Sequence, residues 1–160
     1  MGGLVPQCDA ASPAPVPQDY LDTVRLRKGS RFGENDIKSF VYHVFAMYDR
    51  HVHVGKLLPL FADQGLQMRF PDATLSSHED FKRWYAGIGK SIKSNTHQVE
   101  RLSVTLFGGG RYQADLIVLW RAEGRDGKFI SMRVHQVWTM DDKAKGRWPR
   151  ILSYIAEEAP

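Results

Sequence analysis

The chain has 160 residues, of which 42% are hydrophobic and 25% are charged, a composition typical of one globular domain rather than of a disordered or fibrous protein. Its single cysteine, Cys8, excludes a disulfide framework and a multi-cysteine zinc site, and no window holds the roughly 18 apolar residues of a membrane span. The net charge is +4, but acidic residues are interspersed among the basic ones, so neither nucleic acid nor a membrane is an expected partner.

The first 30 residues are predicted to form a flexible arm. Four of the eight prolines lie there, at positions 6, 13, 15 and 17, among alanine and serine. A single folded domain over residues 31–157 follows. Residues 1–11 lack both the cationic start and the apolar run of a secretory signal, which makes a cytoplasmic protein the expectation.

Two long helices are predicted in the first half of the domain, because apolar residues recur there with helical spacing. A short helix over residues 54–63, with Pro59 near its first turn, and a short strand over residues 66–70 are expected between them. The third helix begins at Ser76 or Ser77, either of which can cap it. The apolar stripes of the two long helices are Ile37, Phe40, Val41, Val44, Phe45 and Tyr48, and then Phe81, Trp84, Tyr85, Ile88 and Ile92.

After Asn95 the pattern changes to long β-branched and aromatic runs over residues 96–107, 111–123, 128–140 and 147–156. The glycines at 108–110, the Asp126-Gly127 pair and residues 143–146 separate them and favour hairpins. Helices first and strands afterwards indicate an α+β fold. We expect a curved, mostly antiparallel sheet wrapped around the N-terminal helices, which leaves a cone with an open mouth.

Three residues are candidates for acid–base chemistry. Asp49 continues the buried helical row of Val41 and Phe45, so its carboxylate needs a partner there, although a simple cap or an exposed helix end is the alternative. His97 opens the first long strand and His135 lies in the middle of the third. A histidine beside a carboxylate suits proton transfer near neutral pH, whereas a hydrogen-bonded core residue is the alternative for each.

The remaining signals point to a small-molecule pocket that needs no metal or cofactor. His51 and His53 are spaced wrongly for one helical face and have no evident third ligand. Phe70, Trp84 and Trp120 supply large aromatic surface, which serves either as plain core or as the wall of a pocket.

The order of elements and the segment from Tyr48-Asp49-Arg50 to residues 57–63 (Leu-Leu-Pro-Leu-Phe-Ala-Asp) resemble the nuclear-transport-factor-2-like superfamily, over about residues 31–157. Its enzymes include scytalone dehydratase, ketosteroid isomerase and SnoaL-like cyclases. The resemblance to scytalone dehydratase implies that Asp49 orients His97 as the general acid/base. Comparison with both enzymes places His135 as a pocket-facing hydrogen-bond donor.

The chain also departs from these enzymes. The isomerase's general base would fall at about Phe70, which cannot take a proton. The dehydratase's second histidine would fall near Leu119 or Trp120, and its tyrosine on the short strand near Arg69 or Phe70.

We therefore expect a cofactor-independent lyase or isomerase that acts on a small hydrophobic or cyclic compound. Asp49 and His97 are the expected catalytic pair, and Tyr48, His135, Phe70, Trp84 and Trp120 are expected to bind the substrate. The alternative is a ligand-binding, protein-binding or oxygenase-subunit-like member of the same superfamily without catalysis. Because the strands carry apolar residues on both faces, for example over residues 116–119, a homodimer formed through the sheet is also expected.

Overall fold

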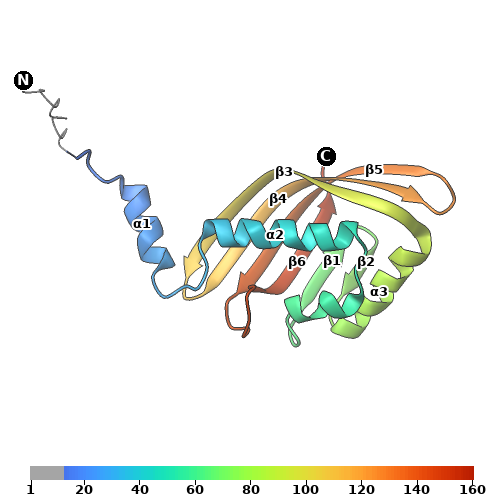
Figure 1. Ribbon diagram of the computed structural model, residues 1–160, viewed down its shortest axis with the longest axis horizontal. Helices are drawn as coiled ribbons and strands as arrows, with labels where there is room; N and C mark the ends of the chain where they lie inside the picture. The colour runs from blue at the N-terminus through green and yellow to red at the C-terminus, as the bar shows by residue number, and fades with distance from the viewer. Residues whose placement is uncertain (1–12) are drawn as a thin grey trace, which may run out of the picture.

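A computed structural model of the chain describes residues 13–160 and has an α+β fold with one curved six-stranded sheet (Figure 1). The strand order is β2-β1-β6-β5-β4-β3, and every neighbouring pair is antiparallel except β1 and β6. The predicted fold class is thus confirmed. The elements are α1 (Gln18–Arg27), α2 (Glu34–Asp49), the 3-10 turns η1 (Val54–Lys56) and η2 (Leu58–Leu60), β1 (Gln67–Phe70), β2 (Ala73–Leu75), α3 (His78–Ser91), β3 (Ile92–Gly108), β4 (Arg111–Gly124), β5 (Phe129–Asp141) and β6 (Arg150–Glu158).

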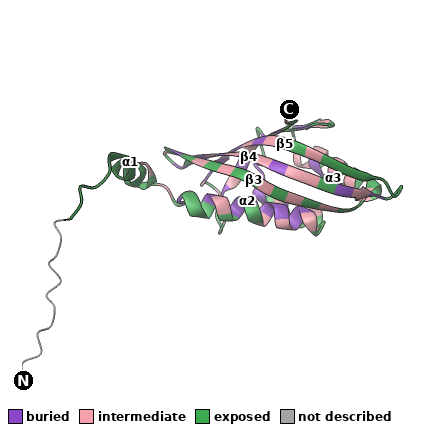
Figure 2. Ribbon diagram, turned by 90° about the horizontal axis from the view of Figure 1, so that it is seen from above, coloured by how far each residue is buried: buried purple, intermediate pink, exposed green. Residues whose placement is uncertain are grey.

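The hydrophobic core lies between α2 and the concave face of the sheet (Figures 1 and 2). The apolar stripe of α2 is buried as its spacing predicts, and alternate residues of β4, β5 and β6 face it. Trp138 is fully buried in this core, and its ring centroid lies 5.4 Å from that of Phe45 and 4.5 Å from that of Tyr154. The helix therefore fixes which face of each strand points inward.

Glycine-containing turns connect the long strands. Gly108, Gly109 and Gly110 all have positive φ and join β3 to β4, where a side chain at any of the three would be strained. Gly127 also has a positive φ and lies in the turn that joins β4 to β5. A shift in the β3–β4 register between Val99 and Arg101 marks a bulge, the kind of irregularity that increases the bend of a strand.

The N-terminal segment differs from the predicted arm. Residues 18–27 form α1, which contains no buried residue and projects away from the sheet (Figure 1). It begins directly after Pro17, with Asp19 in its first turn and Arg25 and Arg27 in its last. Charges placed in this way stabilise the helix through its dipole. The proline-rich composition thus ends before residue 18 rather than at residue 30. The part of the predicted arm over residues 1–12 lies outside the described residues.

Smaller differences occur between the two long helices. The single short helix predicted over residues 54–63 is instead two 3-10 turns, and Pro59 lies in the second of them. The strand β2, which follows β1 after a tight turn, had no sequence signal strong enough to predict it. None of the helices in residues 13–160 has the length and apolarity needed to cross a membrane.

Candidate functional site

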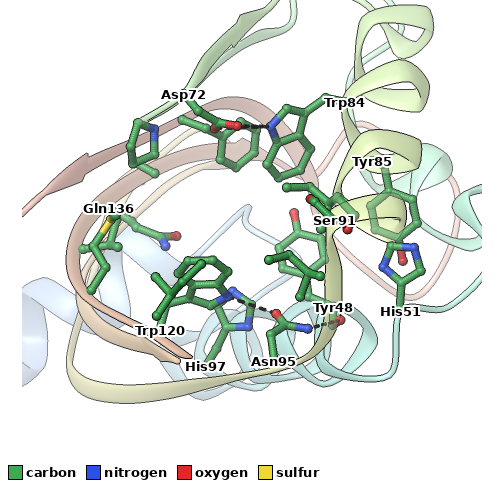
Figure 3. Close-up of a pocket in the computed structure, with 18 of the residues that line it drawn as sticks. Tyr48, His51, Asp72, Trp84, Tyr85, Ser91, Asn95, His97, Trp120 and Gln136 are labelled. Atoms are coloured by element: carbon green, nitrogen blue, oxygen red, sulfur yellow. Dashed lines mark hydrogen bonds between the residues drawn. The ribbon is translucent and has the colours of Figure 1, made fainter. Parts of the chain in front are cut away.

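A cavity of about 360 Å³ opens at the wide end of the cone, beyond the last turn of α2 (Figure 3). Its wall is mostly apolar, with a few polar groups that converge on it, as in small-molecule sites. No lysine or arginine lines it among the residues that the structure describes. The lining residues are Tyr48, His51, Phe70, Pro71, Asp72, Trp84, Tyr85, Ile88, Ser91, Ile92, Asn95, His97, Trp120, Ile130, Met132, Val134, Gln136, Tyr154 and Ala156.

Asp49 and His97 meet at the floor of this cavity. Oδ1 of Asp49 lies 2.7 Å from Nδ1 of His97 and accepts the backbone N–H of the same residue at 3.0 Å. The two side chains are 31% and 13% exposed, so the contact is shielded from most of the solvent. Asp49 thus continues the helical row of Val41 and Phe45 and places its carboxylate beside the first residues of β3.

This contact fixes the chemistry of the imidazole. Because a carboxylate oxygen accepts at Nδ1, that nitrogen carries the proton in the neutral ring and Nε2 keeps a lone pair. Nε2 has no hydrogen-bond partner within residues 13–160. The ring is also stacked on Phe45, with centroids 4.9 Å apart and planes 18° from parallel. A ring held in this way presents one basic nitrogen to the cavity in a single orientation.

Three further polar side chains lie inside the cavity without a complete set of partners. The hydroxyl of Tyr48 is buried and unpaired within the described chain, and burial raises the pKa of Tyr48 well above its ordinary value. Burial likewise raises the pKa of Tyr154. Nε1 of Trp138 donates to Oε1 of Gln136 at 3.0 Å, which turns the amide nitrogen of Gln136 away from that contact. All three are neutral groups that can donate to a ligand oxygen.

Aromatic rings form two of the walls. Phe70 and Trp84 stack with centroids 4.0 Å apart and planes 10° from parallel, and Nε1 of Trp84 donates to both oxygens of Asp72 at 3.3 Å. Opposite them, Nε1 of Trp120 donates to Oδ1 of Asn95 at 3.1 Å. Both tryptophans are therefore fixed by a hydrogen bond at the ring edge, and their faces form a flat slot.

His135 does not line the cavity, so the pocket-facing position expected for it is wrong. Successive strand residues point to opposite faces, and on β5 Val134, Gln136 and Trp138 point inward. His135 therefore points to the convex face, where its Nε2 lies 3.0 Å from Oδ1 of Asp115. The resemblance assigned the pocket-facing polar group to His135, whereas the polar residue that points inward is its neighbour Gln136.

The other expected site residues are brought together. Tyr48, Phe70, Trp84, Trp120 and His97 all line the cavity, with Asp49 behind His97. Seven further polar residues of the lining were not among the expected site residues: His51, Asp72, Tyr85, Ser91, Asn95, Gln136 and Tyr154. Strand parity could have identified Gln136 and Asn95, since they share a face with Trp138 and His97 respectively; Tyr154 and His51 carried no comparable signal.

Comparison with known proteins finds similarity in structure and none in sequence. No family model and no curated protein matches the chain. Among solved structures, an NTF2-like superfamily protein from Salmonella enterica superposes with a TM-score of 0.71 at 13% identity, covering 86% of this chain and 94% of that one. A scytalone dehydratase-like protein from Novosphingobium aromaticivorans gives 0.68 at 13% identity, with 88% and 89% covered.

A third similar structure is the hexachlorocyclohexane dehydrochlorinase LinA-type3 from Novosphingobium barchaimii, with a TM-score of 0.66 at 10% identity over 88% of this chain and 91% of that one. At these identities the likeness is one of fold. The chain has the nuclear-transport-factor-2-like fold over nearly all of its described length, as the sequence resemblance implied.

Proposed function

We propose that the cavity is the active site of a cofactor-independent lyase or isomerase that acts on a small cyclic organic compound. The observation that carries this proposal is the 2.7 Å contact between Asp49 and Nδ1 of His97, which leaves Nε2 as a base inside an aromatic slot. Two neighbours in fold bear the names of enzymes that eliminate a small molecule, a dehydratase and a dehydrochlorinase, which supports the reaction class.

In the proposed reaction, Nε2 of His97 removes a proton from a carbon next to a carbonyl group. The electron pair of that C–H bond forms the C=C bond of an enolate, and the carbonyl electrons move to oxygen. Asp49 stabilises the imidazolium that results. In lyase chemistry the C=O bond then re-forms, a C=C bond forms between the α- and β-carbons, and the group that leaves the β-carbon takes the proton from His97. In isomerase chemistry a neighbouring C=C bond extends the enolate to a dienolate, which takes the proton back from His97 at its γ-carbon.

Tyr48 and Gln136 are the groups proposed to stabilise the enolate oxygen. Both residues line the cavity and are more than nine-tenths buried, with the Tyr48 hydroxyl itself buried, and a fixed donor in a shielded site stabilises a developing oxyanion strongly. The raised pKa of Tyr48 keeps its hydroxyl protonated across the pH range of a folded protein. Gln136 thus replaces His135 in the role that the resemblance suggested, while Phe70, Trp84 and Trp120 pack against the substrate ring.

Exchange of the α-protons of 2-tetralone for deuterium, followed by NMR, tests this proposal without knowledge of the natural substrate. Wild-type protein should accelerate the exchange, and His97→Gln should lose about 100-fold or more of that acceleration. His135→Gln is the matched control, because it changes a histidine on the convex face, and it should exchange at the wild-type rate. Equal rates for His97→Gln and wild type would refute the assignment of the base.

A ligand-binding protein without catalysis is the second candidate, because much of the polar lining is already engaged within the protein. Asp72 and Asn95 hold the tryptophans, and the hydroxyl of Ser91 donates to Gly87 O at 3.1 Å, so the remaining wall is largely apolar. Binding of 2-tetralone in the cavity without any His97-dependent exchange would favour this second candidate.

We also propose that the protein forms a homodimer through the convex face of the sheet, which no helix of residues 13–160 covers (Figure 2). Ile117, Leu119, Val137 and Ile155 are only partly buried there, and such a cluster is unusual on a face left wet. Light scattering should give twice the monomer mass, and Leu119→Lys should shift the protein to the monomer. A monomeric wild type at micromolar concentration would contradict the dimer.

A further inference from the structure

His51 is the polar residue of the cavity mouth that the proposed reaction leaves without a role. Its imidazole lines the cavity at an exposed position and has no hydrogen-bond partner in the described part of the chain. The other polar side chains at this side of the cavity are engaged, since Ser91 and Tyr85 donate to backbone oxygens and Asp72 accepts from Trp84. His51 is therefore the group here with hydrogen-bonding capacity to spare.

The backbone of His51 is in an unfavourable conformation. Its φ is 45°, and it is the one non-glycine residue of residues 13–160 with a positive φ. It follows the C-cap of α2, where Val52 N donates to Met47 O and His51 N donates to Tyr48 O. This is the helix-ending pattern in which glycine usually occupies the left-handed position. A histidine in its place strains the backbone, because its Cβ crowds the following carbonyl oxygen.

The structure also holds the ring of His51 in one place. The ring is stacked on Tyr85 with centroids 4.2 Å apart and planes 5° from parallel, and the Tyr85 hydroxyl is anchored on Val52 O at 2.5 Å. On α3, a Cβ added at Gly89 would lie 2.8 Å from Nε2 of His51, so only glycine lets the helix approach this closely. A glycine inside a helix is itself unfavourable, and here it makes room for the imidazole.

His51 lies at the opposite end of the cavity from Gln136, one of the two proposed oxyanion donors. Figure 3 shows Gln136 on one side, His51 on the other beneath Tyr85, and the tryptophan faces and Tyr48 between them. The cavity thus offers polar groups with hydrogen-bonding capacity at two ends, with the aromatic faces and the proposed reacting groups Tyr48 and His97 between the ends. A ligand that fills it gains hydrogen bonds at both ends only if it carries two polar atoms separated by a ring.

We propose that His51 is a second recognition group, which binds a hydroxyl or carbonyl oxygen on the far side of the substrate ring from the reacting carbonyl. This inference rests on the proposed function for its assignment of the reacting end. No lysine or arginine from residues 13–160 lines the cavity to bind an acidic group, and Asp72, the carboxylate that could bind a cation, already accepts from Trp84. The second substituent is therefore a neutral oxygen rather than a charged group. His51 would therefore determine specificity and would take no part in the proton transfer of His97.

The test compares two flat probes, 2-naphthol and 2,6-dihydroxynaphthalene, which differ by one hydroxyl at the opposite end of the rings. Wild type should bind the diol about 3- to 10-fold more tightly in calorimetry, the gain expected of one added hydrogen bond. His51→Gly should abolish this preference. Its Tm should stay within about 3 °C of wild type, because relief of backbone strain offsets the lost ring stacking. The matched control His53→Asn changes an exposed histidine outside the cavity that caps Gly55 N, and it should keep the preference.

A second pair of variants tests the same role without altering His51. Gly89→Ala places a Cβ against Nε2 of His51 and should reduce the preference for the diol. Gly87→Ala lies on the same helix with nothing within 4 Å of the added carbon and should leave the preference intact. The ring protons of His51 should also shift more in NMR spectra with the diol than with 2-naphthol.

The outcomes separate this inference from the proposed function. A preference for the diol that persists in His51→Gly and Gly89→Ala, or that is absent from wild type while both probes bind, overturns the role of His51. Failure of both probes to shift the indole signals of Trp84 and Trp120 overturns the ring-binding cavity and the role of His51 together. A preference that depends on His51, found with no His97-dependent exchange of 2-tetralone, supports the recognition role while the catalytic proposal fails.

Discussion

Substitution of Asp49 offers a way to separate what the carboxylate does for the fold from what it does for the reaction. Its Oδ1 accepts two hydrogen bonds from His97, one from the backbone nitrogen and one from Nδ1. Asp49→Asn keeps an acceptor oxygen at the same place and removes only the negative charge. Asp49→Leu has a similar volume, removes the acceptor and leaves both donors of His97 unpaired.

The two variants should differ in stability. A shielded donor that loses its partner costs about 1–3 kcal/mol, and His97 is only 13% exposed, so solvent replaces the lost bonds incompletely. For two donors we expect a loss of about 2–4 kcal/mol in Asp49→Leu, which lowers Tm by roughly 5–12 °C for a chain of this size. Asp49→Asn should lose about 1 kcal/mol or less, a change in Tm of no more than about 4 °C.

The two variants should nevertheless be alike in catalysis. Without the negative charge, the imidazolium that forms as His97 takes a proton loses its stabilising partner, so Asp49→Asn should lose about 100-fold or more of the 2-tetralone exchange despite a near-normal Tm. Thermal unfolding followed by circular dichroism and deuterium exchange followed by NMR provide the two measurements. A Tm for Asp49→Leu equal to that of wild type would show that the carboxylate does not hold His97. Undiminished exchange in Asp49→Asn would show that its charge plays no part in the reaction.

Two further predictions concern charges away from the cavity. Arg150→Met should lower Tm by roughly 10 °C in thermal unfolding, because Asp141, which is 2% exposed, loses its bidentate partner and remains buried as an unpaired charge costing about 3–5 kcal/mol. Arg150→Lys keeps the positive charge and should lower Tm less. Equal Tm values for Arg150→Met and wild type would contradict the reasoning. Burial lowers the pKa of His43 below its ordinary value of 6.5, and the positive charges of Arg147 and Arg50 lower it further. The unfolded chain therefore binds a proton at this histidine more readily than the folded chain does. The free energy of unfolding should fall as the pH drops from about 6.5. Arg147→Gln should make this decline shallower in unfolding curves recorded between about pH 5 and pH 7, and an unchanged slope would show that Arg147 does not act on His43.

The sequence was sufficient for the fold class and for much of the cavity wall. The helical stripe that ends in Tyr48 and Asp49 and the glycine-separated strands are local patterns, and local patterns survive folding when they agree with one another. Trp84 and Phe70 could be expected in a pocket because the sequence combines large aromatic side chains with a carboxylate, that of Asp49, at the end of a buried helical stripe. Their stacking on each other depends on a packing that brings α3 over β1, and no local pattern encodes that contact.

The error at His135 has a specific physical origin. Along β5 both faces carry apolar residues, with Val137 on the convex side and Trp138 on the concave side, so hydrophobic alternation alone does not show which residues point inward. A family resemblance at low identity then tolerates a shift of one residue, and a shift of one residue in a strand exchanges its two faces. The parity of Trp138 and Met140 with Gln136 would have resolved the choice.

The position of the cavity follows from a difference in length between the helix and the strands. The 16 residues of α2 span about 24 Å, whereas the 17 residues of β3 span about 55 Å before bending. Where α2 covers the sheet, inward-facing side chains such as Leu116 and Met140 are apolar and fully buried. Beyond Asp49 the same face is uncovered, and there the inward rows contain His97 and Gln136. The end of one helix thus creates the space, places a carboxylate at its floor and, in the turn that follows, brings His51 to its rim.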